Sequence, residues 1–133
     1  MTKYSDHFTA EELQCPTSKQ VILEPGFIDD LEELRVAYGK GMAVTSGCRS
    51  TAHNDWLQSR GYPASENSFH LINNPKYGTD CCAVDVARPA GPDLRKLLAA
   101  ALERGWSVGL AKTFVHLDMR GKYARVQSTF YTY

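Results

Sequence analysis

Two segments of the sequence contain residue types that bind metal ions in proteins. The first begins at Ser46 and includes His70 and Asp85, and the second surrounds His116 near the C-terminus. Together they supply two histidines and a carboxylate, which is the ligand set of a catalytic zinc with one open coordination position. The chemistry that these residue types indicate is metal-assisted hydrolysis.

The sequence around His116 indicates a strand with one polar face. Side chains alternate between the faces of a strand, so His116 and Asp118 share a face with Phe114. The opposite face is apolar and predicts contact with the core through Val115, Leu117 and Met119. Asp85 lies between two valines, where a carboxylate needs a partner or a metal. Each residue alone also has a structural explanation, because a single His is often a satisfied core or surface residue and Asp85 could cap a strand end.

The combination of motifs resembles the zinc peptidases of peptidoglycan. This family includes D-alanyl-D-alanine carboxypeptidases and phage L-alanyl-D-glutamate endolysins, and it shares its fold with the Hedgehog signalling domain. The most similar branch carries S-G-Y-R-S, H-N, S-x-H-x-x-G-x-A-x-D-[IV] and F-V-H-x-D. The sequence has SGCRS at 46–50, HN at 53–54, SFH at 68–70, AVDV at 83–86 and FVHLD at 114–118. The segment FTAEEL at 8–13 and the helix up to Tyr38 also match, so the resemblance covers nearly the whole chain.

The resemblance implies that His70, Asp85 and His116 are zinc ligands. The family leaves six residues between the first His and the Asp, whereas residues 71–84 intervene here. We interpret the extra residues, up to position 80, as an inserted loop over the cleft. The insertion makes Asp80 a rival ligand, and we favour Asp85 because its AVDV context matches the family.

The resemblance also implies roles for residues around the metal. Arg49 is expected to bind substrate or stabilise the oxyanion, and Ser68 to contribute to substrate binding. His53 and Asn54 are expected to support the loop of Arg49 structurally. Two positions depart from the family: Cys48 replaces the usual aromatic, and Thr113 stands where some relatives have an acidic general base. Asp118 is then the best candidate for the base, with orientation of a metal ligand as its alternative role.

The predicted function is zinc-dependent hydrolysis of a peptide bond in peptidoglycan stem peptides. The enzyme would be a D,D-carboxypeptidase or an L-Ala-D-Glu endopeptidase, of the kind found among phage lysis or tail proteins. One alternative is a non-catalytic zinc-containing binding or virion structural module on the same fold. Another is a thiol enzyme that pairs Cys48 or Cys82 with His70 or His53. We rank the thiol enzyme low because nothing in the sequence supplies the helix N-terminus or the basic environment that lowers a thiol pKa.

The elements that would position these residues indicate an α+β fold. We expect a small antiparallel sheet that bears the zinc site and packs against two main helices, as in the Hedgehog/DD-peptidase fold. Thr9 begins a capping box and a short helix. Apolar spacing predicts one main helix from Phe27 to Tyr38. The second should begin at Pro92 and end at Gly105, with an apolar face of Leu94, Leu97, Leu98, Ala101 and Leu102.

Shorter elements are expected between and after these helices. Buried strands are predicted at 42–45, 83–86, 106–111 and 113–119, and a helical turn at 51–61. Residues 61–80 hold too many Gly, Pro and Asn residues for regular structure and are expected to form a functional loop. A basic and aromatic tail follows residue 119.

Length and charge limit the number of domains, the partners and the location that we expect for this chain. The 133 residues predict a single domain, 1–133, and we expect a monomer. Fifteen basic residues balance fifteen acidic ones, which argues against nucleic-acid or membrane partners. Without an apolar span or a signal-peptide core, synthesis in the cytoplasm is expected, with action on the cell wall in the periplasm after release or as part of a virion. The four cysteines, Cys15, Cys48, Cys81 and Cys82, are expected to be buried reduced thiols.

Overall fold

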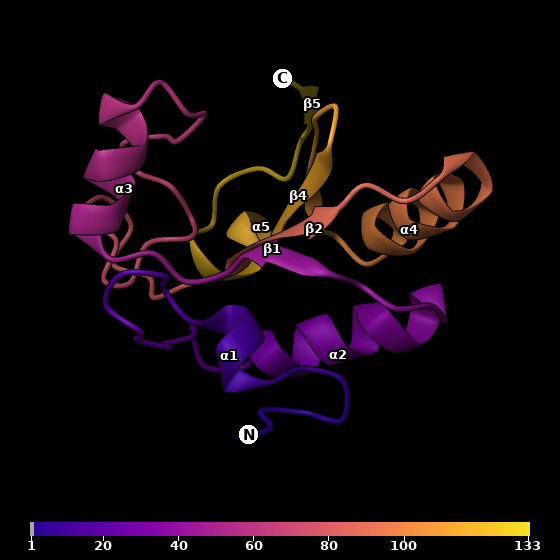
Figure 1. Cartoon of the computed structure of the whole chain (residues 1–133). Coiled ribbons are helices and arrows are strands. Elements are labelled where there is room, and N and C mark those ends of the chain that lie inside the picture. Colours follow the sequence, from indigo (N-terminus) through magenta and orange to yellow (C-terminus); the bar gives the residue numbers. More distant parts are fainter. Residues whose placement is uncertain (1) are drawn as a thin grey trace.

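A five-stranded mixed sheet forms the centre of the structure, a computed structural model that describes residues 2–133. Met1, the first residue of the predicted domain, lies outside the described residues. The expected α+β class is confirmed (Figure 1). The elements, in chain order, are α1 (Ala10–Leu13), α2 (Phe27–Tyr38), β1 (Val44–Ser46), α3 (Thr51–Ser59), β2 (Ala83–Ala87), α4 (Gly91–Glu103), β3 (Ser107–Leu110), β4 (Phe114–Asp118), α5 (Arg120–Tyr123) and β5 (Phe130–Thr132).

The strand order is β1-β2-β4-β3-β5, and the expectation of a purely antiparallel sheet is wrong at the last strand. β2 pairs antiparallel with β1 and β4, and β4 pairs antiparallel with β3. β5 pairs parallel with β3. β4 ends beside Ser107 at the start of β3, and α5 with residues 124–129 takes the chain across to the other edge of β3, so β5 begins at the same end and runs parallel. Residues 130–132 of the predicted tail are therefore part of the sheet.

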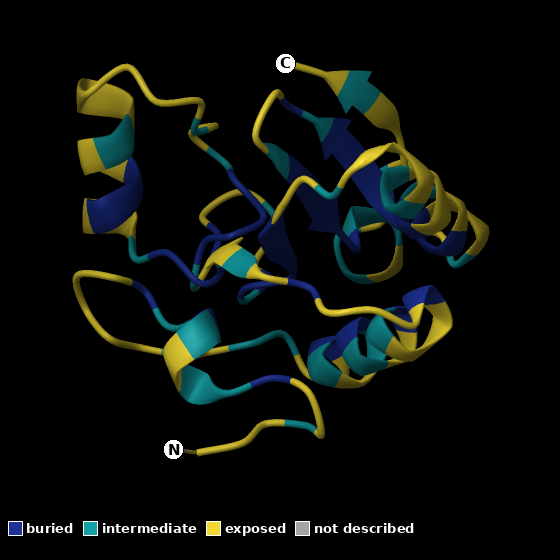
Figure 2. Ribbon diagram, turned by 45° about the vertical axis from the view of Figure 1, so that its right-hand side comes forward, coloured by how far each residue is buried: buried dark blue, intermediate teal, exposed yellow. Residues whose placement is uncertain are grey.

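One face of the sheet is apolar and packs against the two long helices. The alternation predicted around His116 is observed, since Val115 and Leu117 are fully buried in the core. Val84 and Val86 of β2 are their register partners. Burying each such side chain stabilises the fold by about 1.5–3 kcal/mol. The central strands are among the most buried parts of the molecule (Figure 2), which fixes how the opposite face presents its polar residues.

The two main helices lie close to where the sequence predicts them. The bounds and buried face of α2 are confirmed, and it ends at Gly39 in a left-handed conformation, φ 78°. In α4, Pro92 is the second residue because Gly91 begins the helix. Leu102 is 47% exposed rather than part of the apolar face, and Ala100 is buried instead. None of the helices in residues 2–133 has the length and apolar character needed to cross a bilayer.

The segment between β1 and β2 wraps the polar side of the sheet. Its helical turn is a nine-residue helix, α3, capped by Ser50, whose Oγ accepts from the His53 amide at 3.2 Å. Among the described residues, 60–82 contain no helix or strand, as expected for an irregular loop. Asn74 organises this loop: its Oδ1 accepts from the amides of Lys76 and Tyr77. All four cysteines are free and buried, as predicted.

Candidate metal centre

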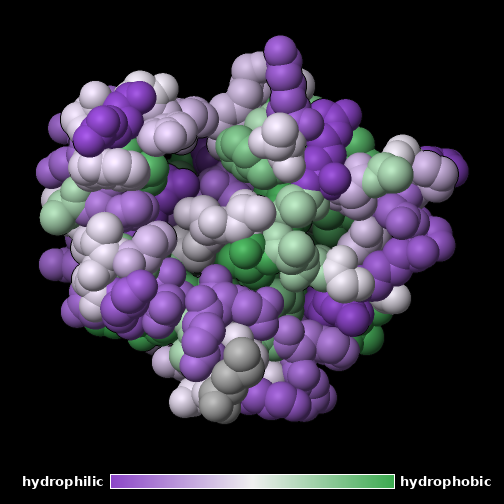
Figure 3. All heavy atoms as spheres, in the orientation of Figure 1, coloured by the Kyte–Doolittle hydropathy of each residue, from purple (hydrophilic) through white to green (hydrophobic). Residues whose placement is uncertain are grey.

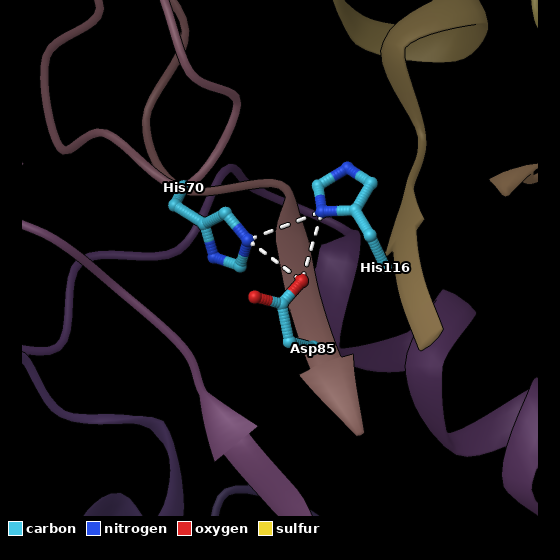
Figure 4. A group of neighbouring side chains, drawn as sticks. All are labelled: His70, Asp85 and His116. Carbon is cyan, nitrogen blue, oxygen red and sulfur yellow. Dashed lines mark hydrogen bonds and ion pairs between the residues drawn. The ribbon is translucent and has the colours of Figure 1, made fainter. Parts of the chain in front are cut away.

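Three side chains from separate parts of the chain converge on one point on the polar face of the sheet. Asp85 comes from β2, and its register partner His116 comes from β4. His70 comes from the irregular segment. The distances are 2.9 Å from Asp85 Oδ1 to His116 Nδ1, 3.1 Å from Asp85 Oδ1 to His70 Nε2, and 3.2 Å between those two nitrogens (Figure 4). The ligand set implied by the resemblance therefore forms one buried cluster.

The backbone around His70 is fixed on two sides. The Arg49 amide donates to the carbonyl oxygen of His70 at 2.9 Å, which joins this residue to the loop after β1. Ser68 Oγ accepts from the His70 amide at 3.2 Å. On the other side, the Cys82 amide donates to the carbonyl oxygen of Phe69 at 3.0 Å, just before β2. These hydrogen bonds connect the irregular segment at His70 to the loop after β1 and to the residue just before β2.

The second nitrogen of each histidine ring is already occupied. Nδ1 of His70 lies 2.7 Å from the carbonyl oxygen of Gly47, which can only accept, so this nitrogen carries the proton. Nε2 of His116 lies 2.7 Å from Oδ2 of Asp118 and donates in the same way. The other ring nitrogens, His70 Nε2 and His116 Nδ1, both face Asp85 and offer lone pairs to a metal when the rings are neutral. Metal-binding histidines commonly have such partners, which fix tautomer and orientation.

The donor set and its spacing fit a zinc ion. Tetrahedral bonds of 2.0–2.1 Å place ligand atoms about 3.3 Å apart. The three distances between the ligand atoms, 2.9–3.2 Å, need to increase only slightly to reach this value. Two imidazoles and one carboxylate are also a usual ligand set of catalytic zinc. His70, Asp85 and His116 would hold the ion and leave its fourth position toward the adjoining pocket, which all three line.

The pocket measures about 530 Å³ and lies between the sheet and the irregular segment. Its other lining residues are Arg49, Pro63, Ala64, Ser65, Asn67, Ser68, Phe69, Lys76, Tyr77, Arg120, Tyr131 and Tyr133. Three of them are cationic, and among residues 2–133 the only carboxylate that lines the pocket is the candidate ligand Asp85. Hydrophilic residues cover most of the face seen in Figure 3, with hydrophobic ones nearer its middle.

Burial and charge pairing shift the ionisation of the cluster. Burial lowers the pKa of His70, and the positive charge of Arg49 lowers it further. Burial also acts to lower the pKa of His116, but its hydrogen bonds with Asp118 and Asp85 outweigh this and raise the value to about 9. Burial raises the pKa of Asp85, yet the histidines more than offset it and hold the carboxyl well below its usual range. A metal must displace the proton from His116 before it can bind.

Arg49 lies in the pocket wall beside the candidate ligand Asp85. Its Nη2 donates to Asp85 Oδ2 at 3.4 Å, its Nη1 to Asn54 Oδ1 at 3.5 Å and its Nε to Ser46 Oγ at 3.3 Å. Asn54 in turn donates through Nδ2 to the carbonyl oxygen of Ser65 at 2.9 Å. Asn54 therefore links Arg49 to the loop that lines the pocket.

Three other residues that the sequence indicated for the site, His53, Ser68 and Asp80, differ in their contacts. The His53 ring stacks on Trp56 with centroids 5.8 Å apart, and its amide donates to Ser50 Oγ, next to Arg49, at 3.2 Å. Ser68 lines the pocket and also holds the His70 backbone. The rival ligand Asp80 is outside the cluster, because its Oδ1 accepts from the Asn73 amide at 3.1 Å and stabilises the inserted loop.

Asp118 lies behind His116 and is fully buried. It accepts from His116 Nε2 and from three nitrogens of Arg120, at 2.7–3.2 Å. Burial raises its pKa, but these hydrogen bonds outweigh that effect and lower it to about 2. The carboxylate is not among the groups that line the pocket. The geometry thus favours orientation of His116 over the general-base role expected from the sequence.

Sequence reasoning gave no role to several residues that line the pocket. Tyr131 and Tyr133 come from the C-terminal tail, and Arg120 is the first residue of α5, two positions after the end of β4. The available signal was the two-residue spacing of the tyrosines, which puts both on one face if the tail forms a strand. Nothing in the sequence predicted which sheet edge that strand would join.

Comparisons of this chain with protein-family models, with curated proteins and with solved structures found no match. The chemistry of the site is therefore inferred from its own residues and geometry.

Proposed function

We propose that this protein is a zinc-dependent hydrolase that cleaves a peptide bond in peptidoglycan stem peptides, as a carboxypeptidase or an endopeptidase on a Hedgehog/DD-peptidase-like fold. The observation that carries the proposal is the convergence of His70 Nε2, Asp85 Oδ1 and His116 Nδ1 within 3.2 Å of one another beside an open pocket. The five motifs that resemble the zinc peptidases of peptidoglycan support the same function. The enzyme would act on the cell wall after release or as part of a virion.

The residues around the pocket suit a peptide that carries carboxylates. Arg49, Lys76 and Arg120 line it, and stem peptides present carboxylates to such cations. A bound zinc would supply an activated water and polarise the scissile carbonyl. Arg49 would orient the substrate through its guanidinium while its bond to Asp85 holds that ligand in place. Phe69 and Tyr77, stacked with centroids 5.1 Å apart, would exclude water from one side.

A non-catalytic zinc module remains the second candidate function. The observation that favours it is the lack, among the described pocket-lining residues, of a carboxylate beyond Asp85 that could accept a proton from water. Such a module would bind a stem peptide or another virion protein without cleaving it. The two candidates share the metal site and differ only in turnover.

Hydrolysis of purified sacculi separates these candidates. Zinc-loaded protein is expected to release soluble muropeptides, whose masses identify the bond that is cut. A chelator should stop the release, and added zinc should restore it, because the three ligands supply no reactive group without the ion. A protein that holds one zinc per chain but leaves the sacculi intact would favour the non-catalytic module.

Asp118→Asn is expected to weaken zinc binding by about 10–100-fold, because the amide is a poorer acceptor for the His116 Nε2 proton than the carboxylate. Turnover should return to nearly the wild-type rate once zinc is saturating. Chelator competition gives the affinity, and sacculus hydrolysis gives the rate. Asp55→Asn, at an exposed position of α3, is the matched control. Normal zinc affinity with a rate about 100-fold lower at saturating zinc would instead identify Asp118 as the general base.

A further inference from the structure

One row of residues crosses the sheet through the metal centre and ends on the C-terminal strand. Asp85 of β2 is opposite His116 of β4, His116 is opposite Gly109 of β3, and Gly109 is opposite Tyr131 of β5. Residues in one row of a sheet present their side chains to the same face. Tyr131 therefore belongs to the same face as the two strand-borne candidate ligands.

Gly109 provides the space that brings the phenol of Tyr131 toward the metal centre. A Cβ at position 109 would lie 2.6 Å from Cζ and 2.7 Å from the hydroxyl oxygen of Tyr131. Gly109 is not among the residues with positive φ, so its backbone conformation alone does not require glycine. The glycine is needed because the outer half of the Tyr131 ring occupies the position that a side chain would take. The Tyr131 ring centroid is 6.2 Å from that of His116.

Neighbouring groups hold the Tyr131 ring in this position. The Arg120 guanidinium carbon lies 5.8 Å from its centroid, and Arg120 is fixed in turn by Asp118. The Tyr133 ring lies 5.6 Å away and packs edge-on against Phe114 at 5.1 Å. Both tyrosines line the pocket. Tyr131 of β5 and Tyr133, which follows that strand, thus form an aromatic wall on the His116 side of the candidate metal site.

We propose that the Tyr131 hydroxyl binds the substrate, donating a hydrogen bond to the carbonyl oxygen of the peptide bond that lies against the metal centre. The inference rests on the proposed function and adds a residue to it. A phenol is neutral at pH 7 and can donate a proton to a carbonyl oxygen. The bond strengthens as that oxygen gains negative charge, and the loss of one such donor typically slows a reaction by about 100-fold or more.

Tyr131→Phe tests this role because it keeps the ring over Gly109 and removes only the hydroxyl. The probe is a phosphinate analogue of an alanyl-alanine dipeptide, whose charged oxygens imitate the attacked carbonyl, with affinity measured by calorimetry on the zinc-loaded protein. We expect the phosphinate Kd to rise about 10–100-fold and sacculus hydrolysis to fall about 100-fold, with zinc affinity and Tm unchanged. Gly109→Ala, which displaces the ring, should weaken phosphinate binding in the same direction. Tyr4→Phe, in the N-terminal segment, should change neither quantity.

The outcomes separate this inference from the proposed function. Wild-type phosphinate affinity in a folded, zinc-loaded Tyr131→Phe protein would overturn the role of Tyr131, even if sacculi are still cleaved. Failure of the wild-type protein to bind the phosphinate would overturn it as well. Tyr131-dependent phosphinate binding by a protein that leaves sacculi intact would support the role of Tyr131 and reject the proposed hydrolysis.

Discussion

Asp85→Ala and Asp85→Asn are expected to abolish stoichiometric zinc binding, whereas Asp80→Ala keeps one zinc per chain. Asp85 Oδ1 lies within 3.1 Å of both candidate histidine ligand atoms, so its loss removes one of three ligands. Asp80 instead accepts from the Asn73 amide in the inserted loop. Its removal should cost roughly the 1 kcal/mol of an ordinary hydrogen bond and leave the metal in place.

Two variants of Asp85 are needed because alanine also leaves Arg49 buried without its carboxylate partner. Breaking such a buried pair can cost about 3–5 kcal/mol, so Asp85→Ala could fail to fold. Asn also removes the negative charge, but it keeps the shape of the side chain and an oxygen that can accept from Arg49 Nη2, so it tests ligation with that hydrogen bond retained. Elemental analysis gives the zinc content. In wild type, free zinc at about 100 times Kd should raise the free energy of unfolding by about 2.7 kcal/mol, and neither Asp85 variant should show this gain. A zinc-free Asp80→Ala beside a zinc-loaded Asp85→Asn would move the ligand to the inserted loop.

The parts of the fold that follow from local sequence were predictable. The capping box at Thr9 and the apolar spacing of α2 depend on neighbours within a few residues, and both are observed. β5 depends on a distant partner, because its three residues pair with β3 about twenty positions earlier in the chain. Such short segments carry too little periodicity to distinguish a strand from an extended tail. The parallel edge of the sheet was missed for that reason.

The candidate site was likewise predictable only where its features follow from the local sequence. Alternation around His116 indicated which side chains would leave the core, and the AVDV context selected Asp85 over Asp80. The role of Asp118 could not be settled from spacing, because sharing a face with His116 is compatible with a position in the pocket or behind the ring. Arg120 decides between them, since three of its nitrogens donate four hydrogen bonds to the carboxylate. The position of Arg120 depends on how the chain passes from β4 into α5, which the sequence did not reveal.

Arg49→Lys is expected to slow hydrolysis by about 100-fold or more while the protein stays folded and zinc-loaded. The guanidinium uses three separate nitrogens to reach Ser46, Asn54 and Asp85, and it still lines the pocket. A lysine ammonium has a single nitrogen and cannot present a planar pair of donors to a substrate carboxylate or an oxyanion. The charge that balances Asp85 is preserved, so most of the metal site should survive the change.

The measurement is the rate of sacculus hydrolysis at saturating zinc, beside zinc affinity by chelator competition. Arg95→Lys, at an exposed position of α4, is the matched control and should behave as wild type. If the Arg49→Lys rate recovers when zinc is raised, the guanidinium acts mainly by holding Asp85 as a ligand. If the rate stays low with zinc fully bound, the missing interaction is with the substrate itself. A folded, zinc-loaded Lys variant with nearly normal turnover under all conditions would exclude both roles for Arg49.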